Sequence, residues 1–374
     1  MELDLSEDQE LFRETTRKFL ESECPLTTVR QWANDADGFQ RSWWQQGAEL
    51  GWTALLVPEE HGGGSISGEG LRDLVLVAEE MGRLASPGPL APVNLVAYAL
   101  ATAGTDDQRG SVLQSLIAGE TIGAWAFNEA NKPSDAAAVA MSATVDGDGF
   151  VLNGVKIPVE AGAQAEQLLV TARTANGVTN FLVPSDTAGI TVTALKTLDF
   201  TRRFAKVTFD NVKVPTSAVV GAVDGGAELV EKLVQIALVL QCAETVGATE
   251  RVLEFTIEWA FDRYSFGRPL ASYQALKHRF ADMKMWLESS AGLTNWATRA
   301  VQAGADNAAE LASSAKAYVS DRCPEIMQDC VQLHGGMGVT WEHDLHLYLR
   351  RATTHRGTYG GPIEHRERVA ALAN

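Results

Sequence analysis

The segment RYSFGRPLASYQ at residues 263–274 decides the fold, together with QLHGGMG at residues 332–338. In the first, Arg263 ends one helical pattern, a Phe-Gly turn follows and Gln274 opens the next helix, so a guanidinium and an amide are offered to a pyrophosphate. In the second, Gly335 and Gly336 let backbone N–H groups approach phosphate or ribose oxygens closely. Either segment alone favours a helix hairpin with a glycine C-cap. Both in this order within one helical region favour a nucleotide site.

The sequence on both sides of these segments has a helical period. One apolar face carries Leu229, Leu233, Ile236 and Leu240, and another carries Leu276, Phe280, Met283 and Leu287. Further helices are expected over residues 307–333 and after Pro362. Long helices with short connections predict an antiparallel four-helix bundle.

The middle of the chain has the pattern of short strands. Residues 144–145 and 150–152 flank an Asp-Gly-Asp-Gly turn, and residues 168–170 and 181–183 flank an Asn176-Gly177 turn. Both are hairpin signals. Further strands at residues 191–195 and 206–209 predict a small antiparallel β-barrel or sandwich.

The amino-terminal third is again helical. Ser6 and Gln9 form a capping-box pattern, and amphipathic stretches follow near residues 43–52, 71–84 and 95–103. The predicted fold class is α+β multidomain: an N-terminal α-helical bundle, a middle antiparallel β domain and a C-terminal four-helix bundle. The predicted domains are 1–120, 121–217 and 218–374.

The overall composition excludes several classes of partner. The formal net charge of -17 would repel nucleic acid and anionic membranes. We find no long uncharged apolar run, and the acidic start MELDLSEDQELF suits neither a secretory signal nor a transit peptide. The four cysteines match no zinc or redox spacing, so we expect reduced, buried thiols and a cytoplasmic protein.

The order of the three zones and the two motifs resembles the acyl-CoA dehydrogenase family over nearly the whole chain. Weaker matches are the segments 51–63 and 209–215. The resemblance implies FAD as cofactor, an acyl-CoA substrate and an electron-transfer flavoprotein as electron acceptor. In the family these motifs hold the adenosine-diphosphate half of FAD across a subunit interface, so the resemblance implies at least a dimer. The residues that carry this role are Arg263, Phe266, Gln274, Gln332, Gly335 and Gly336.

The segments that hold the flavin ring in the family are altered. The family loop Thr-Glu-Pro-x-x-Gly-Ser-Asp corresponds to residues 128–135, where Asn128 replaces Thr, Ser134 is kept, and the Pro and Gly are lost. The family's Lys-x-Trp-Ile-Thr segment stacks its Trp on the flavin. Here Pro158 stands for that Trp and Glu160 for the Thr. A proline offers no aromatic face, and Glu160 adds negative charge beside a ring that becomes anionic on reduction.

The catalytic base is also missing from its family positions. Removing the α-proton of a thioester requires a carboxylate in a desolvated pocket. Counting from the motifs places Tyr359 and Ala237 at the two family positions, and a tyrosine pKa of about 10 makes a poor base. Three weaker candidates are Glu364, for which a helix-start role is favoured, Glu244, which stands among apolar residues, and Glu160.

Histidines near the glycine turn could suggest other chemistry. His334 is expected to be a structural hydrogen-bonding residue. The run Glu342-His343-Asp344-Leu345-His346 could suggest a metal, but we favour an exposed helix-start cluster and expect no metal site.

Three hypotheses follow from this pattern. Residues that serve a neighbour's cofactor are kept, whereas those that serve the chain's own flavin and substrate are altered. The leading hypothesis is therefore a non-catalytic subunit that completes the FAD site of a homologous catalytic subunit, as in heteromeric family members acting on steroid-derived thioesters. The alternatives are a self-sufficient homotetramer or dimer with an atypical base, and a flavin-free scaffold or binding subunit.

Overall fold

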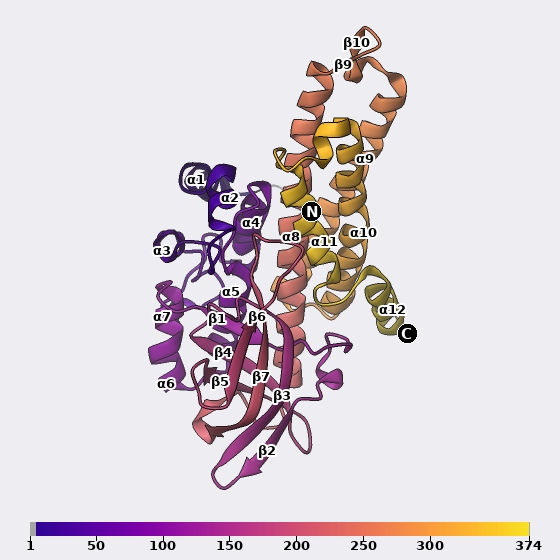
Figure 1. Cartoon of the computed structure of the whole chain (residues 1–374). Coiled ribbons are helices and arrows are strands. Elements are labelled where there is room, and N and C mark those ends of the chain that lie inside the picture. The colour runs from indigo at the N-terminus through magenta and orange to yellow at the C-terminus, as the bar shows by residue number, and fades with distance from the viewer. Residues whose placement is uncertain (1–4, 374) are drawn as a thin grey trace. The chain divides into compact units, whose positions relative to one another are not determined.

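The computed structural model describes residues 5–373 and divides into two compact units. Of the described residues, the helical unit contains 5–30, Val75–Ser86 and 238–373. The sheet unit contains Gln31–Leu74 and Pro87–Ala237. Each unit is described by itself. Along the chain, helices precede a β-sheet and helices follow it (Figure 1), which confirms the predicted fold class.

The sheet unit is built on an eight-stranded sheet. Its strands run in the order β6-β7-β3-β2-β4-β5-β8, and β1 pairs with β4 in parallel. The strands are β1 Gly123–Ala126, β2 Ser142–Asp146, β3 Gly149–Glu160, β4 Gln167–Arg173, β5 Val178–Pro184, β6 Ile190–Ala194, β7 Phe204–Pro215 and β8 Val219–Val220. Glu160, at the end of β3, lies opposite Phe204, at the start of β7.

Helices cover one side of this sheet and connect to it. The helices that belong to the unit, wholly or in part, are α2 Leu26–Trp32, α3 Arg41–Glu49, α4 Gly70–Arg83, α5 Leu90–Ala103, α6 Asp106–Gln108, α7 Gln114–Ile117 and the first residues of α8 Ala227–Asp262. Helix α5 is apolar on almost every face and packs on β1, which explains why most of its side chains are buried.

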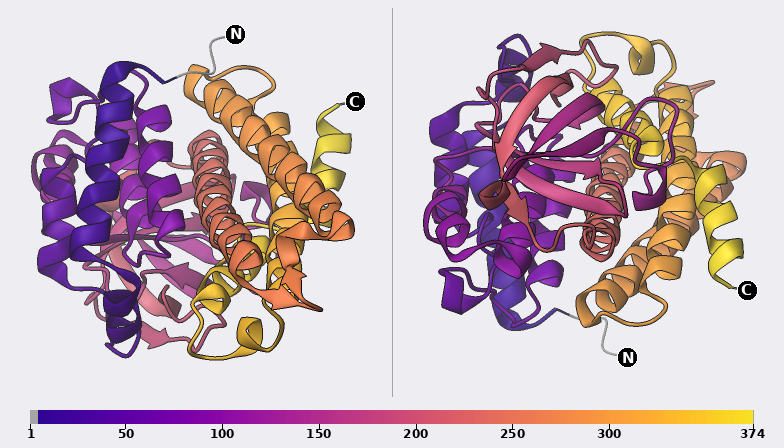
Figure 2. Two further views of the ribbon diagram at one scale, coloured as in Figure 1. Left: turned by 90° about the horizontal axis from the view of Figure 1, so that it is seen from above. Right: turned by 90° about the horizontal axis from the view of Figure 1, so that it is seen from below.

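The helical unit is a bundle of long helices. Its members are α1 Glu7–Glu23, part of α4, α8 from Leu238, α9 Gln274–Ala303, α10 Ala308–His334, α11 Leu345–Gly357 and α12 Pro362–Leu372. Helix α10 contacts α9, α11 and α12, and these orange to yellow helices lie together in both views of Figure 2. The short hairpin of β9 Tyr264–Ser265 and β10 Arg268–Pro269 joins α8 to α9. Among residues 5–373, every helix is too short or too polar to span a membrane.

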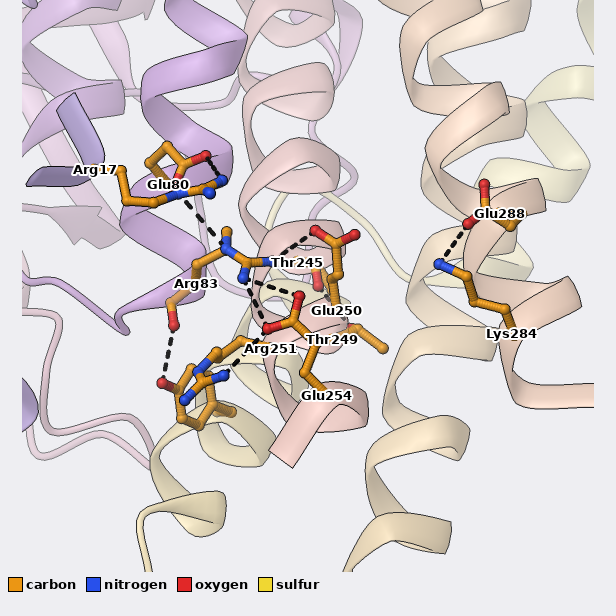
Figure 3. Close-up of polar contacts among 11 residues, drawn as sticks. Arg17, Glu80, Arg83, Thr245, Thr249, Glu250, Arg251, Glu254, Lys284 and Glu288 are labelled. Carbon is orange, nitrogen blue, oxygen red and sulfur yellow. Dashed lines mark hydrogen bonds and ion pairs between the residues drawn. The ribbon is translucent and has the colours of Figure 1, made fainter. Parts of the chain in front are cut away.

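Ion pairs link α1, α4 and α8 within the helical unit (Figure 3). Arg17 pairs with Glu80 at 2.6 Å, and Arg83 pairs with Glu250 at 2.7 Å and Glu254 at 2.8 Å. The side chains of Glu80 and Arg83 are largely buried. Bidentate, partly buried arginine pairs of this kind fix helix register more strongly than isolated surface pairs do.

Candidate functional site

Trp259, near the end of α8, joins the two motifs that the sequence singled out. Its indole Nε1 donates a hydrogen bond to the carbonyl oxygen of Leu333 at 3.2 Å. Its ring stacks on His334 with the centroids 5.3 Å apart, and the Arg263 guanidinium lies 5.9 Å from its ring centroid. Segments about seventy residues apart are therefore adjacent within the helical unit, and both contact Trp259.

The predicted nucleotide-binding residues lie at the surface of this unit. Arg263, Gln274 and Gln332 are exposed, and Phe266 is 97% exposed. Gly335 has φ +59°, a conformation that favours glycine. A Cβ built on Gly335 or Gly336 would meet no atom within 4 Å. The space beside this turn is open to a ligand.

His334 supports the turn, and the single N–H of its neutral ring is used in a hydrogen bond. Its Nδ1 lies 2.8 Å from the carbonyl oxygen of Cys330 and must donate to it, since a carbonyl only accepts. Burial lowers the pKa of His334, so the ring is neutral at neutral pH. This arrangement is structural.

The histidine cluster after the turn is half-buried, and our expectation of an exposed cluster was wrong. The His343 ring packs edge-on against His334 at 4.6 Å, and His346 stacks on Trp341 at 4.8 Å. Within residues 5–373, no group of three or more His, Cys, Asp or Glu residues is arranged to hold a metal ion.

In the sheet unit, side chains of the loop that corresponds to the family's flavin loop form hydrogen bonds with other residues of the same unit. Ser134 Oγ donates to Asn128 Oδ1 at 2.8 Å. The Glu129 carboxylate accepts from Lys156 Nζ at 2.7 Å and from the backbone N–H groups of Ala140 and Met141. The polar groups that were predicted to face a flavin are engaged with protein partners.

Lys156 and Glu129 form a buried ion pair. Burial lowers the pKa of Lys156 to about 8, although the Glu129 charge acts in the opposite direction. Burial also acts to raise the pKa of Glu129, but the Lys156 charge and the backbone N–H donors outweigh it, so that pKa is lowered. The pair fixes the loop to β3.

At the end of β3, Glu160 faces an arginine that the sequence reasoning missed. Arg202 Nη1 lies 3.8 Å from Glu160 Oε1, and Arg202 also donates to the carbonyl oxygen of Gly88. Arg202 is 4% exposed. The available signal was the Arg202-Arg203 pair directly before β7, where two cations precede a largely apolar strand.

The two family positions for the base carry no carboxylate. Ala237 is fully buried and has no functional group. Tyr359 has φ +58°, and its backbone carbonyl accepts a hydrogen bond from His365 Nε2 at 2.9 Å.

Two of the substitute acids have structural partners. Glu244 Oε1 lies 2.7 Å from Arg351 Nη1, and both side chains are buried. Glu364 Oε2 accepts from the backbone N–H of Gly361 at 2.6 Å and so caps the start of α12. Glu160, the third, is paired with Arg202. Each substitute acid is thus engaged in a stabilising contact.

Comparison with known proteins places this architecture and these motifs in one class, the flavin-dependent acyl thioester dehydrogenases. Models of the N-terminal, middle and C-terminal domains of acyl-CoA dehydrogenase match residues 6–120, 124–212 and 224–372. The chain is 30% identical to the acyl-CoA dehydrogenase IpdE2 of Mycolicibacterium smegmatis over 98% of this chain and 99% of that protein. The chain belongs to the acyl-CoA dehydrogenase family.

Two solved structures resemble the chain throughout. A variant of the Tcur3481-Tcur3483 steroid ACAD is 26% identical, with a TM-score of 0.89 over 98% of both chains. The ChsE4-ChsE5 complex of Mycobacterium tuberculosis is 25% identical, with a TM-score of 0.89 over 100% of this chain and 99% of that chain. The protein is an oxidoreductase of this class, in a family whose members use FAD.

The residues of this chain fit one half of FAD and not the other. The open glycine turn and the exposed Arg263 suit an adenosine-diphosphate moiety, because no Cβ fills the space beside the backbone. On the ring side, Ser134 donates to Asn128 within the loop and Glu160 is paired with Arg202. These ring-side residues do not fit an isoalloxazine.

Proposed function

We propose that this chain is the non-catalytic subunit of a heteromeric acyl-CoA dehydrogenase, and that it completes the FAD site of a homologous catalytic subunit. The observation that carries this proposal is that the residues of the chain suit the adenosine-diphosphate half of FAD and do not suit its ring. Arg263 and His334, which precedes the glycine turn, both lie against Trp259, whereas Glu160 on the ring side is paired with Arg202. The base positions support the same conclusion, since Tyr359 and Ala237 cannot act as carboxylates.

In the proposed assembly, the partner supplies the ring site and the base that removes the α-proton. When bound, FAD would supply the acceptor for the β-hydride of the acyl-CoA, and an electron-transfer flavoprotein would receive the electrons. This chain contributes Arg263, the glycine turn and the exposed β9–β10 hairpin. The Tcur3481-Tcur3483 and ChsE4-ChsE5 likenesses support a two-chain assembly and a bulky, steroid-derived acyl-CoA as substrate.

Purification alone and with a partner tests this function. The chain is produced by itself and together with each acyl-CoA dehydrogenase homologue of its source genome, and flavin content is measured by absorbance. Turnover is measured on short, branched and steroid-derived acyl-CoAs. We expect a colourless, inactive lone chain and a yellow, active complex with one homologue.

The other hypotheses predict different outcomes. A yellow lone chain that turns over any acyl-CoA would establish the self-sufficient homomer and refute the proposal. A colourless chain that stays colourless with every homologue would point to a flavin-free binding subunit.

A further inference from the structure

Arg202 and Glu160 meet where the β3 and β7 strands meet. Glu160 ends β3 opposite Phe204, and Arg202 precedes β7 by two residues. The turn before β7 is held by Asp199, whose carboxylate accepts from the backbone N–H of Thr201 at 2.8 Å. Strand pairing and this turn therefore fix both ends of the ion pair.

The two side chains are withdrawn from solvent. Arg202 is 4% exposed and the Glu160 side chain 14% exposed. The carbonyl oxygen of Gly88 gives the guanidinium a second acceptor. A buried charge pair is expensive to desolvate and is retained only where further hydrogen bonds satisfy it, so the pair is a specific feature of this location.

Little space remains around the pair. The cavity lined by Glu160, Arg202, Gly88 and Gln164 has a volume of about 10 Å³. That is room for about one water molecule. A three-ring isoalloxazine requires many times that volume. By the family resemblance, Glu160 stands at the Thr of the segment whose Trp stacks on the flavin.

We propose that the Glu160–Arg202 ion pair is an internal plug that occupies the flavin-ring position of this chain and keeps it flavin-free. The inference rests on the proposed function and deepens it, since it names the residues that exclude the ring. Exclusion acts through occupied volume, and the two charges neutralise one another so that the plug remains stable when buried. Removing only one partner would leave an unpaired buried charge and destabilise the sheet unit.

Lumiflavin, which is the isoalloxazine ring without the ribityl phosphate, tests the ring position alone. It is titrated into the full lone chain and followed by fluorescence quenching, with thermal unfolding as a check on folding. Wild type should not bind. The E160T/R202S double variant replaces both side chains by small ones, and we expect its affinity to rise at least about tenfold, or about 1.4 kcal/mol. The E160Q/R202M variant keeps the bulk without the charges and should still exclude lumiflavin.

A matched control is the exposed pair Lys213–Asp146 on β7 and β2, whose atoms lie 3.1 Å apart. The D146T/K213S variant should leave lumiflavin binding at the wild-type level. If E160T/R202S does not fold, E160A/R202A also removes the bulk and the charge of both side chains, and the same gain in affinity is expected of it.

The outcomes separate this inference from the proposed function. A wild-type lone chain that purifies with one flavin per chain overturns both. A colourless wild type, with a folded E160T/R202S that binds no lumiflavin, overturns the plug and leaves the proposed function standing. Binding of lumiflavin by E160Q/R202M would show that charge excludes the ring and would overturn exclusion by volume.

Discussion

At the scale of single residues, Arg263 is the side chain that we propose contacts a neighbour's cofactor most directly. It is exposed and held beside Trp259, so it can meet a pyrophosphate with little loss of conformational freedom. A charge-assisted guanidinium contact contributes about 1.5–3 kcal/mol. We expect Arg263→Ala to weaken FAD binding by the flavin-containing complex roughly ten- to hundredfold.

Flavin release on dilution and fluorescence titration of the apo-complex both measure this effect. Arg299→Ala is the control, because Arg299 lies on α9 and bonds to Asn295 of the same helix. An FAD affinity that is the same in R263A, R299A and wild type would exclude Arg263 from the cofactor site.

Tyr359 tests whether the missing carboxylate is all that this chain lacks. General-base catalysis contributes about 10²–10⁴-fold. We nevertheless expect Tyr359→Glu to give no activity in the lone chain, because the ring-side residues do not fit a flavin. Acyl-CoA turnover is measured in the lone variant and in the variant complex, and the complex should keep its starting activity. Substantial turnover by the lone variant would contradict the altered ring site, and a large loss in the complex would show that Tyr359 works where it stands.

At the scale of elements, Glu244 and Arg351 join α8 to α11. Arg351 also donates to the carbonyl oxygens of Ser86 and Ala85, which follow α4. Removing one partner of a buried pair typically costs about 3–5 kcal/mol. We expect Glu244→Ala to lower the free energy of unfolding by about this amount, measured by denaturant unfolding. Unchanged stability together with lost activity in the complex would instead identify Glu244 as a base.

The free energy of unfolding should also depend on pH, through the carboxyl group of Glu79 on α4. Burial, followed by the charges of Glu80 and Glu250, raises the pKa of Glu79 to about 8. The unfolded chain loses this proton near pH 4.3. Between these values the folded state holds a proton that the unfolded state has released, so stability falls as the pH rises through this window and levels off above about 8.

Glu79→Gln removes this titration. We expect its melting temperature, relative to that of wild type, to rise from pH 5 to pH 8 in a buffer series. The control is Glu288→Gln on α9, where Glu288 forms an exposed pair with Lys284 (Figure 3). Parallel pH profiles for E79Q and wild type would show that Glu79 ionises normally.

Local sequence signals predicted many of the elements and missed the long-range ones. The Ser6–Gln9 capping box and the hairpin that pairs Val145 with Phe150 formed as predicted, because each depends on neighbours in the chain. The parallel pairing of β1 with β4 was not predicted, because β1 is only four residues long and its partner lies over forty residues away. Periodicity carries no information about which distant strands pair.

Prediction of the candidate site from the sequence was limited in the same way, because contacts between distant segments were missed. Arg263 and Gly335 were visible as motifs, but the Trp259–His334 stack that joins them depends on the packing of α8 against α10. Glu160 was recognised as an unusual residue, but its partner Arg202 was not, because strand pairing alone brings the two together. The three predicted domain boundaries stay a prediction.

At the scale of the whole molecule, the proposed assembly divides each FAD site between two chains. Each FAD of the proposed assembly needs one ring site from the partner and one adenosine-diphosphate site from this chain. We therefore expect the purified complex, with equal numbers of the two chains, to contain one FAD for every two chains. Flavin absorbance after denaturation and quantitative amino-acid analysis together give this ratio. One FAD per chain would show that this chain also holds a ring.

The exposure of Phe266 at the tip of the β9–β10 turn has a consequence for the abundance of the protein in the cell. Phe261, Tyr264 and Phe266 are 64%, 63% and 97% exposed near this turn, and a group of exposed apolar side chains marks an interaction surface or, when left uncovered, an aggregation liability. In the proposed assembly the catalytic chain covers it. The abundance of this protein would then follow the supply of its partner, any excess would be degraded, and balanced synthesis of the two chains would be under selection as strongly as any residue of the site.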